Sequence, residues 1–118
     1  MSILTCIPAF NEGKVIDEVI KKCLKFSDQV VVCDDGSTDD TYEIADAAGA
    51  HVIRHDVNIG KGEALRTLFK FAIHSKNDII VTIDGDGQFL PEEIPKLVSD
   101  IKEKKSDIVI GYRFDDAT

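Results

Sequence analysis

The sequence has no long hydrophobic run. No stretch of the 118 residues approaches the roughly 20 consecutive apolar residues of a membrane-spanning helix. The amino terminus also lacks the basic and then apolar layout of a signal peptide. We therefore expect a soluble, cytoplasmic chain without a transmembrane segment.

Basic residues are in the minority. The chain has 14 Lys and Arg against 22 Asp and Glu, which gives a net charge of −8 with the histidines neutral. A protein that follows a nucleic-acid backbone needs a basic face to displace counterions from phosphate. The composition therefore predicts no nucleic-acid partner, although a few cations that converge locally can still bind an anionic substrate.

The sequence has three cysteines, and their spacing is not that of a zinc site or a disulfide pair. Cys6, Cys23 and Cys33 are odd in number, lie among apolar neighbours and show no Cys-x-x-Cys spacing. This arrangement predicts reduced core residues, not a disulfide or a zinc site.

A composition of 43% apolar and 31% charged residues is that of one packed domain, which we assign to residues 1–118. Five β-rich runs alternate with four other segments. The predicted strands are Ile3–Ile7, Gln29–Cys33, His51–His55, Asp78–Ile83 and Asp107–Ile110. Apolar stripes at helical spacing begin at Ile16, Leu65 and Ile94. A further helix is predicted at 41–48, where Ser37 and Asp40 resemble a capping box and Gly49 suits the position past its end.

Strict alternation of strands and helices predicts an α/β fold: a three-layer α/β/α arrangement around a mostly parallel sheet. Ligands of such sheets bind beyond the carboxyl ends of the strands. The segments that follow the strands are therefore the place to look for chemistry.

Two carboxylates follow the fourth predicted strand. Asp84 and Asp86 flank a glycine, so an extended chain can aim both into one site, and Gln88 adds a neutral oxygen. These hard oxygen donors suit Mg²⁺ or Mn²⁺. A glycine-rich turn with solvated aspartates is the alternative, but two close carboxylates repel each other without a cation.

Asp34 and Asp35 follow the second strand, and at least one should accept hydrogen bonds from a base or ribose. We favour Asp35 for this role. A turn and helix cap is the expected role of the polar residues that follow: Ser37, Thr38, Asp39 and Asp40.

Cations also occur near strand ends. Gly60-Lys61-Gly62 precedes a helix, where backbone N–H groups, the positive helix end and a lysine could bind a pyrophosphate. Arg113 could bind phosphate or pair with the terminal acidic residues, whereas Arg66 is expected on the surface. The three histidines show no ligand or triad spacing and are interpreted as structural or exposed: His51, His55 and His74.

Together, five motifs in this order resemble the amino-terminal part of a glycosyltransferase family 2 enzyme with the Rossmann-like GT-A fold. The resemblance is closest to dolichyl- or polyprenyl-phosphate sugar synthases. The motifs are Ile7–Glu12, Asp34–Thr38, Gly60–Gly62, Asp84–Gln88 and Gly111–Arg113. The resemblance implies strand order 3-2-1-4-5 and metal-dependent, inverting transfer of a sugar from a UDP- or GDP-sugar to a polyprenyl or dolichyl phosphate.

The same resemblance assigns roles to individual residues. The nucleoside pocket would be lined by Pro8, Phe10, Glu12 and Asp35, with Asp35 bonding the base. Lys61 and Asp84 would contact the donor, while the metal would be held by Asp84, Asp86 and Gln88. Asp86 and Arg113 would be catalytic, with Arg113 directed at phosphate.

Relatives continue well beyond this length. We therefore expect a fragment that holds the donor half of a longer enzyme at the cytoplasmic face of a membrane, and that transfers sugar poorly or not at all. A lipid phosphate is already anionic near pH 7, so such an acceptor needs no general base.

Two alternatives come from other classes. A haloacid-dehalogenase-type phosphatase would use Asp84 as nucleophile after the apolar strand, but its motif normally lies near the start of the domain. A non-catalytic, receiver-like signalling module would carry its acidic pair after the first strand, whereas this chain carries it after the second.

Overall fold

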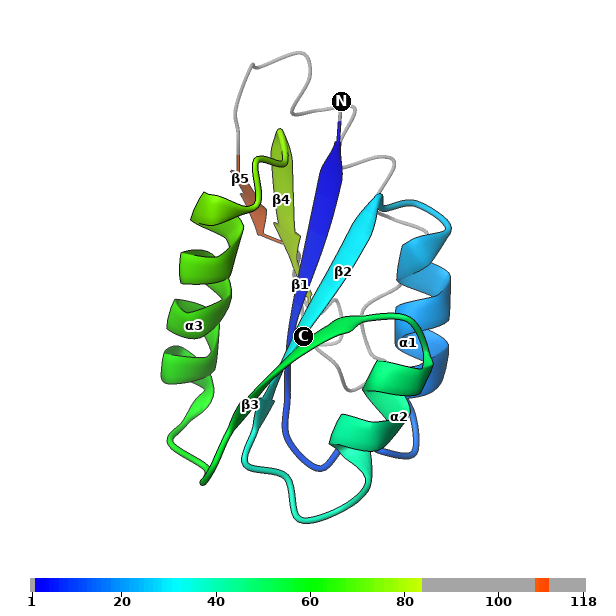
Figure 1. The fold of residues 1–118 in the computed structure, drawn as a ribbon, viewed down its shortest axis with the longest axis vertical. Helices are drawn as coiled ribbons and strands as arrows, with labels where there is room; N and C mark the ends of the chain where they lie inside the picture. The colour runs from blue at the N-terminus through cyan, green and yellow to red at the C-terminus, as the bar shows by residue number, and fades with distance from the viewer. Residues whose placement is uncertain (1, 84–107, 111–118) are drawn as a thin grey trace, which may run out of the picture.

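The computed structural model describes residues 2–83 and 108–110. Within them, five parallel strands form one sheet in the order β3-β2-β1-β4-β5 (Figure 1). The strands are β1 (Ile3–Ala9), β2 (Gln29–Asp35), β3 (His51–His55), β4 (Ile79–Thr82) and β5 (Ile108–Ile110). Both the parallel sheet and the expected strand order are confirmed.

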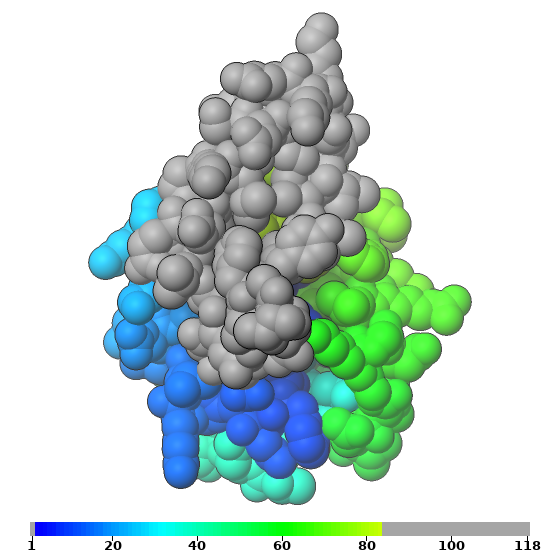
Figure 2. Space-filling view, turned by 180° about the vertical axis from the view of Figure 1, so that it is seen from behind, coloured from blue at the N-terminus to red at the C-terminus, as the bar shows by residue number. Residues whose placement is uncertain are grey.

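Helices cover both faces of the sheet. α1 (Ile16–Leu24) and α2 (Thr41–Ala47) lie on one face, and α3 (Lys61–His74) lies on the other (Figure 1). Seen from behind, α1 in blue and α3 in green again lie on opposite flanks (Figure 2). The three-layer prediction is confirmed, while the helix expected from Ile94 lies outside the described residues. In the part of the chain that is described, no helix combines the length and the apolar character needed to cross a membrane.

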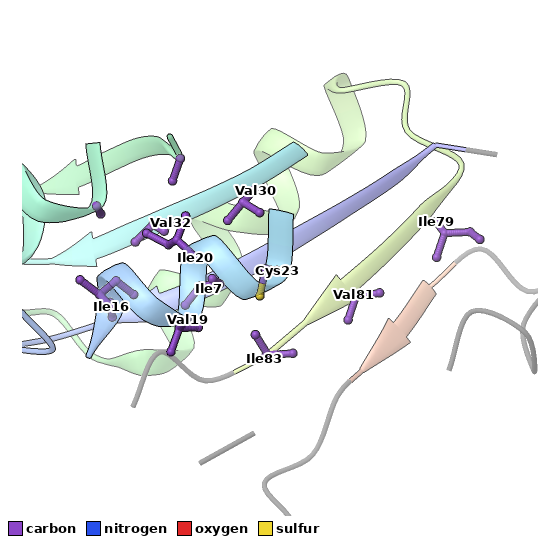
Figure 3. Packing of buried hydrophobic residues seen from close by; sticks show 13 residues of the cluster. Ile7, Ile16, Val19, Ile20, Cys23, Val30, Val32, Ile79, Val81 and Ile83 are labelled. Carbon is purple, nitrogen blue, oxygen red and sulfur yellow. The ribbon is translucent and has the colours of Figure 1, made fainter. Parts of the chain in front are cut away.

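Each face of the sheet has its own apolar core. On the α1 face, the predicted stripe is confirmed and packs onto β1, β2 and β4 (Figure 3), with all four of its members buried: Ile16, Val19, Ile20 and Cys23. On the α3 face, the buried residues are Ala64, Leu68 and Ala72, whereas Leu65 and Phe69 are only partly buried. The predicted stripe is therefore confirmed at Leu68 and Ala72, and Leu65 packs against the same core, to which Ala64 adds a buried contact that the sequence pattern does not predict. All three cysteines are free and buried, as expected.

Two strands are longer than the sequence predicts. Pro8 pairs with Cys33 and Ala9 with Asp34, so β1 and β2 each continue for two residues past the predicted ends. Asp35 in turn pairs with His55 of β3. The polar and proline residues had suggested a loop, but the parallel pairing continues through them and places Asp35 at the last position of β2.

Candidate functional site

The carboxyl ends of β1, β2 and β3 lie together at one end of the sheet, the lower end in Figure 1. Pro8 is buried within β1, and Phe10 follows the strand with 43% of its surface exposed. Since Ala9 pairs with Asp34, Phe10 follows at the level of Asp35. Four of the predicted site residues lie outside the described residues: Asp84, Asp86, Gln88 and Arg113.

Hydrogen bonds join the segment after β1 to the segment after β2. The Asn11 N–H donates to Ser37 Oγ at 2.8 Å, and the Thr38 N–H donates to Asn11 Oδ1 at 2.8 Å. The Glu12 N–H donates to Thr41 Oγ1 at 2.9 Å, and that threonine is fully buried. The backbone of the predicted nucleoside-binding segment is therefore fixed by the neighbouring turn.

Asp39 caps α2. One carboxylate oxygen accepts from the Thr41 N–H at 3.0 Å and from the Thr41 hydroxyl, and the other accepts from the Gly13 N–H at 3.1 Å. The bond from the Thr41 hydroxyl is the main cause that lowers the pKa of Asp39. The predicted pairing of Ser37 with Asp40 is therefore wrong, because Asp40 makes no side-chain cap bond and Ser37 bonds Asn11. The turn expected for this segment is confirmed, and Asp39, one of its expected members, bonds the N–H of the first residue of α2.

The carboxylate of Asp35 is buried and accepts four hydrogen bonds. Oδ1 accepts from His55 Nδ1 at 2.8 Å and from the Ile59 N–H at 3.1 Å. Oδ2 accepts from Asn58 Nδ2 at 3.1 Å and from the Gly60 N–H at 2.9 Å. Burial alone would raise the pKa of Asp35, but the bonds from His55 and the two backbone N–H groups outweigh it and lower the pKa below its ordinary value. Asp35 is therefore ionised and tied to the segment that leads into α3.

His55 borders the same site, which the sequence interpretation missed. Its Nε2 lies 2.8 Å from Thr67 Oγ1 of α3, while Nδ1 faces Asp35. The ring thus bridges the sheet and the helix. The sequence does contain one indication of this role. His55 is the last residue of the third predicted strand, and the expected strand order places that strand beside the second, which ends near Asp35.

Cys33 completes what looks like a Cys-His-Asp arrangement, because its Sγ lies 3.6 Å from His55 Nε2. The thiol is fully buried, and burial, with a smaller contribution from the neighbouring carboxylates, raises its pKa to about 12. A thiol with this pKa is not ionised near neutral pH, so it is no nucleophile.

The side chain of Asp34 lies on the face of the sheet opposite to that of Asp35. Its side chain is fully buried, and Oδ1 accepts from the Ser37 N–H at 3.0 Å. Oδ2 lies 3.8 Å from Nε of Arg54, whose guanidinium lies over the Tyr42 ring. Asp34 therefore closes the turn after β2.

Lys61 is the first residue of α3 and is preceded by Gly60, whose φ is +108°. The helix presents its positive end at this point, as the sequence predicts. Arg66 is exposed, as expected. His51 stacks on Phe71, and His74 lies exposed with Nδ1 at 2.9 Å from the Lys70 carbonyl oxygen, so both are structural or exposed as expected.

Comparison with known sequences identifies the family. Glycosyl transferase family 2 matches residues 5–116. An uncharacterized protein of Methanocaldococcus jannaschii is 44% identical over 97% of this chain and 47% of its own length. The UDP-N-acetylglucosamine–dolichyl-phosphate N-acetylglucosaminyltransferase of Methanococcus voltae is 33% identical over 94% of this chain and 51% of its own length. The chain thus spans about half the length of the curated relatives it matches.

A solved structure shows the same fold. Glucosyl-3-phosphoglycerate synthase from Mycobacterium tuberculosis, in complex with Mn²⁺, UDP and glucosyl-3-phosphoglycerate, is 33% identical and superposes with a TM-score of 0.68 over 85% of this chain and 39% of its own. The expected GT-A architecture is confirmed, and neither the phosphatase nor the receiver-like alternative is retained. The chain belongs to glycosyltransferase family 2.

Proposed function

We propose that this chain forms the donor site of a metal-dependent, inverting glycosyltransferase and binds a nucleoside diphosphate sugar at the carboxyl ends of β1, β2 and β3. The observation that carries this proposal is that five predicted site residues lie at the same end of the sheet, at or just after the carboxyl ends of β1, β2 and β3. These residues are Pro8, Phe10, Glu12, Asp35 and Lys61. The family match across residues 5–116 supports it.

The nucleoside would lie against the segment after β1. Phe10 is exposed at the end of β1 and offers an aromatic ring on which a base can stack, while Pro8 is buried in the strand two residues before it. The cross-bonds to the turn after β2 hold Glu12 in place without a ligand. A site that is ordered in advance loses less entropy when its ligand binds.

The diphosphate would lie near the start of α3. Backbone N–H groups at a helix amino terminus and the positive end of the helix dipole favour an anion. Lys61 adds a full positive charge at this position, in a chain whose net charge is −8. A local cation is needed here because the chain as a whole repels phosphate.

The metal ligands would be Asp84, Asp86 and Gln88, which lie outside the described residues. Two carboxylates and an amide are hard oxygen donors, so this set suits Mg²⁺ or Mn²⁺. Ile83, the residue before this motif in the sequence, donates its N–H to the Cys6 carbonyl of β1 at 3.1 Å. When bound, the metal would supply positive charge beside the diphosphate.

The acceptor would be a polyprenyl or dolichyl phosphate, by analogy with the Methanococcus voltae enzyme. The phosphate oxygen would attack the anomeric carbon directly and invert its configuration. Arg113 would neutralise the negative charge of the departing nucleoside diphosphate, and Asp86 would help to hold the metal beside it. A phosphate that is already anionic needs no proton removed.

Calorimetric titration tests the donor site. UDP and GDP, and the sugars linked to them, would be titrated into the chain with and without Mn²⁺. We expect metal-dependent binding of at least one nucleotide, and no metal-dependent heat with any of them would reject the proposal. Lys61→Gln should weaken binding, whereas Lys70→Gln, which changes an exposed lysine on the same helix, should not.

A transfer assay separates the two candidate acceptors. A labelled nucleotide sugar would be offered with a polyprenyl phosphate in detergent, or with 3-phosphoglycerate in solution. We expect label in the lipid fraction. Transfer to 3-phosphoglycerate alone would instead place the protein with the structural relative that was crystallised with glucosyl-3-phosphoglycerate.

A further inference from the structure

The hydrogen bonds of Asp35 leave its carboxylate little capacity for a ligand. An ionised carboxylate offers about four acceptor positions. In this structure four donors of the chain occupy them, from His55, Asn58, Ile59 and Gly60. A base or ribose could bond this carboxylate only by displacing one of these groups.

The four donors all lie in one short segment, residues 55–60. This segment ends at the residue before α3, where Lys61 begins the helix. Asn58 holds Asp35 twice, because its Nδ2 also donates to the Asp35 carbonyl oxygen at 3.2 Å. The buried charge of Asp35 therefore fixes the path of the chain into the proposed diphosphate site.

Among the described groups that bond Asp35, the His55 side chain also bonds a residue of a helix. Since the ionised carboxylate can only accept, the proton between the two groups is on Nδ1 of His55. Thr67 of α3 holds the other ring nitrogen at 2.8 Å. The ring is thus fixed at both nitrogens, and its orientation toward Asp35 is set by the helix.

We propose that His55 is a positioning residue of the donor site: its Nδ1–H holds the Asp35 carboxylate, which fixes residues 58–60 and the start of α3 for the diphosphate. This inference rests on the proposed function. Asp35 thereby also acts through the backbone, because its carboxylate holds the segment that leads to the diphosphate, a group that every nucleotide donor carries. Loss of the His55 bond should therefore weaken all nucleotides alike.

Two substitutions of His55 test the proposal. The side-chain amide of an asparagine can donate from about the place of Nδ1, whereas leucine cannot donate. We expect His55→Leu to weaken UDP and GDP binding by the same factor, about ten- to one hundredfold, as for a lost hydrogen bond to a charged group. His55→Asn should bind within about threefold of the unchanged protein. His74→Asn, on the exposed end of α3, is the matched control and should change nothing.

A second measurement needs no nucleotide. Amide hydrogen exchange at Ile59 and Gly60 should accelerate in His55→Leu and recover in His55→Asn, while exchange in β1 stays unchanged. Equal exchange at these two amides in all variants, or a folded His55→Leu protein that binds nucleotide normally, would overturn the proposal. An unchanged protein that binds no nucleotide would instead reject the proposed function, and the exchange result would still decide whether His55 holds the segment.

Discussion

Gly36 is the position where one added methyl group should disturb the site most. Its φ is +71°, and a Cβ atom would lie 2.3 Å from the backbone nitrogen of Asn58 and 2.3 Å from the carbonyl carbon of Val57. The left-handed conformation costs an alanine about 1–2 kcal/mol. The backbone clash forces the segment before α3 to move, which adds about 1–3 kcal/mol. We expect Gly36→Ala to lower the free energy of unfolding by about 2–5 kcal/mol.

Two other glycines separate the two causes. Gly60 has a φ of +108° and a ψ of +154° with nothing within 4 Å of an added Cβ, so Gly60→Ala should cost the conformational strain alone, about 1–3 kcal/mol. Gly62 lies in α3 with open space and no positive φ, so Gly62→Ala should be neutral or stabilise the helix by up to about 1 kcal/mol. Urea unfolding followed by far-ultraviolet circular dichroism measures all three. The reasoning fails if Gly36→Ala costs no more than Gly60→Ala.

Three further predictions concern the core, the Asp35 carboxylate and the turn after β2. The three buried thiols should not react with a thiol reagent in the folded protein at pH 8, and all three should react in denaturant; rapid reaction of the folded protein would contradict their burial. The pKa of Asp35 is lowered from 3.8, so its contribution to stability is present above about pH 4 and is lost as pH falls below that value. Urea midpoints between pH 7 and pH 3 should therefore fall more steeply in the unchanged protein than in Asp35→Asn, and parallel slopes would count against this account. Thr41→Val removes a buried acceptor and should cost about 1–3 kcal/mol, whereas Thr38→Val, at an exposed hydroxyl, should cost less than about 1 kcal/mol.

The layers of the fold could be predicted because buried residues recur along the sequence with the period of a helix or a strand. The α1 stripe and the near-continuous apolar strands predict which side chains face the sheet, and the structure confirms them. The positions at which β1 and β2 end could not be predicted from this periodicity. Local polarity at Asp34 and Asp35 indicated a loop, but parallel pairing with β1 and β3 extends the strand through them.

The hydrogen bonds of the site could not be predicted from the sequence for a related reason. Asp35 and its donors are separated by 20 to 25 residues, and the bond that Asp39 accepts from the Gly13 N–H spans 26. Periodicity reports which residues are buried, but the choice of donor depends on where two distant turns meet. His55 therefore looked structural in the sequence, although the register places it beside Asp35.

The acidic pair at the end of β2 has two separate functions because successive residues of a strand point to opposite faces. Asp34 points to the α2 face, where it closes the turn and lies near Arg54, and its Oδ2 accepts no hydrogen bond from the described residues. Asp35 points to the α3 face, where both of its oxygens are bonded. The turn that Asp34 closes also holds the segment after β1 through Ser37, whereas Asp35 holds the segment after β3. One dipeptide thus links the three segments that follow β1, β2 and β3, so a change at either residue reaches the proposed site through the backbone.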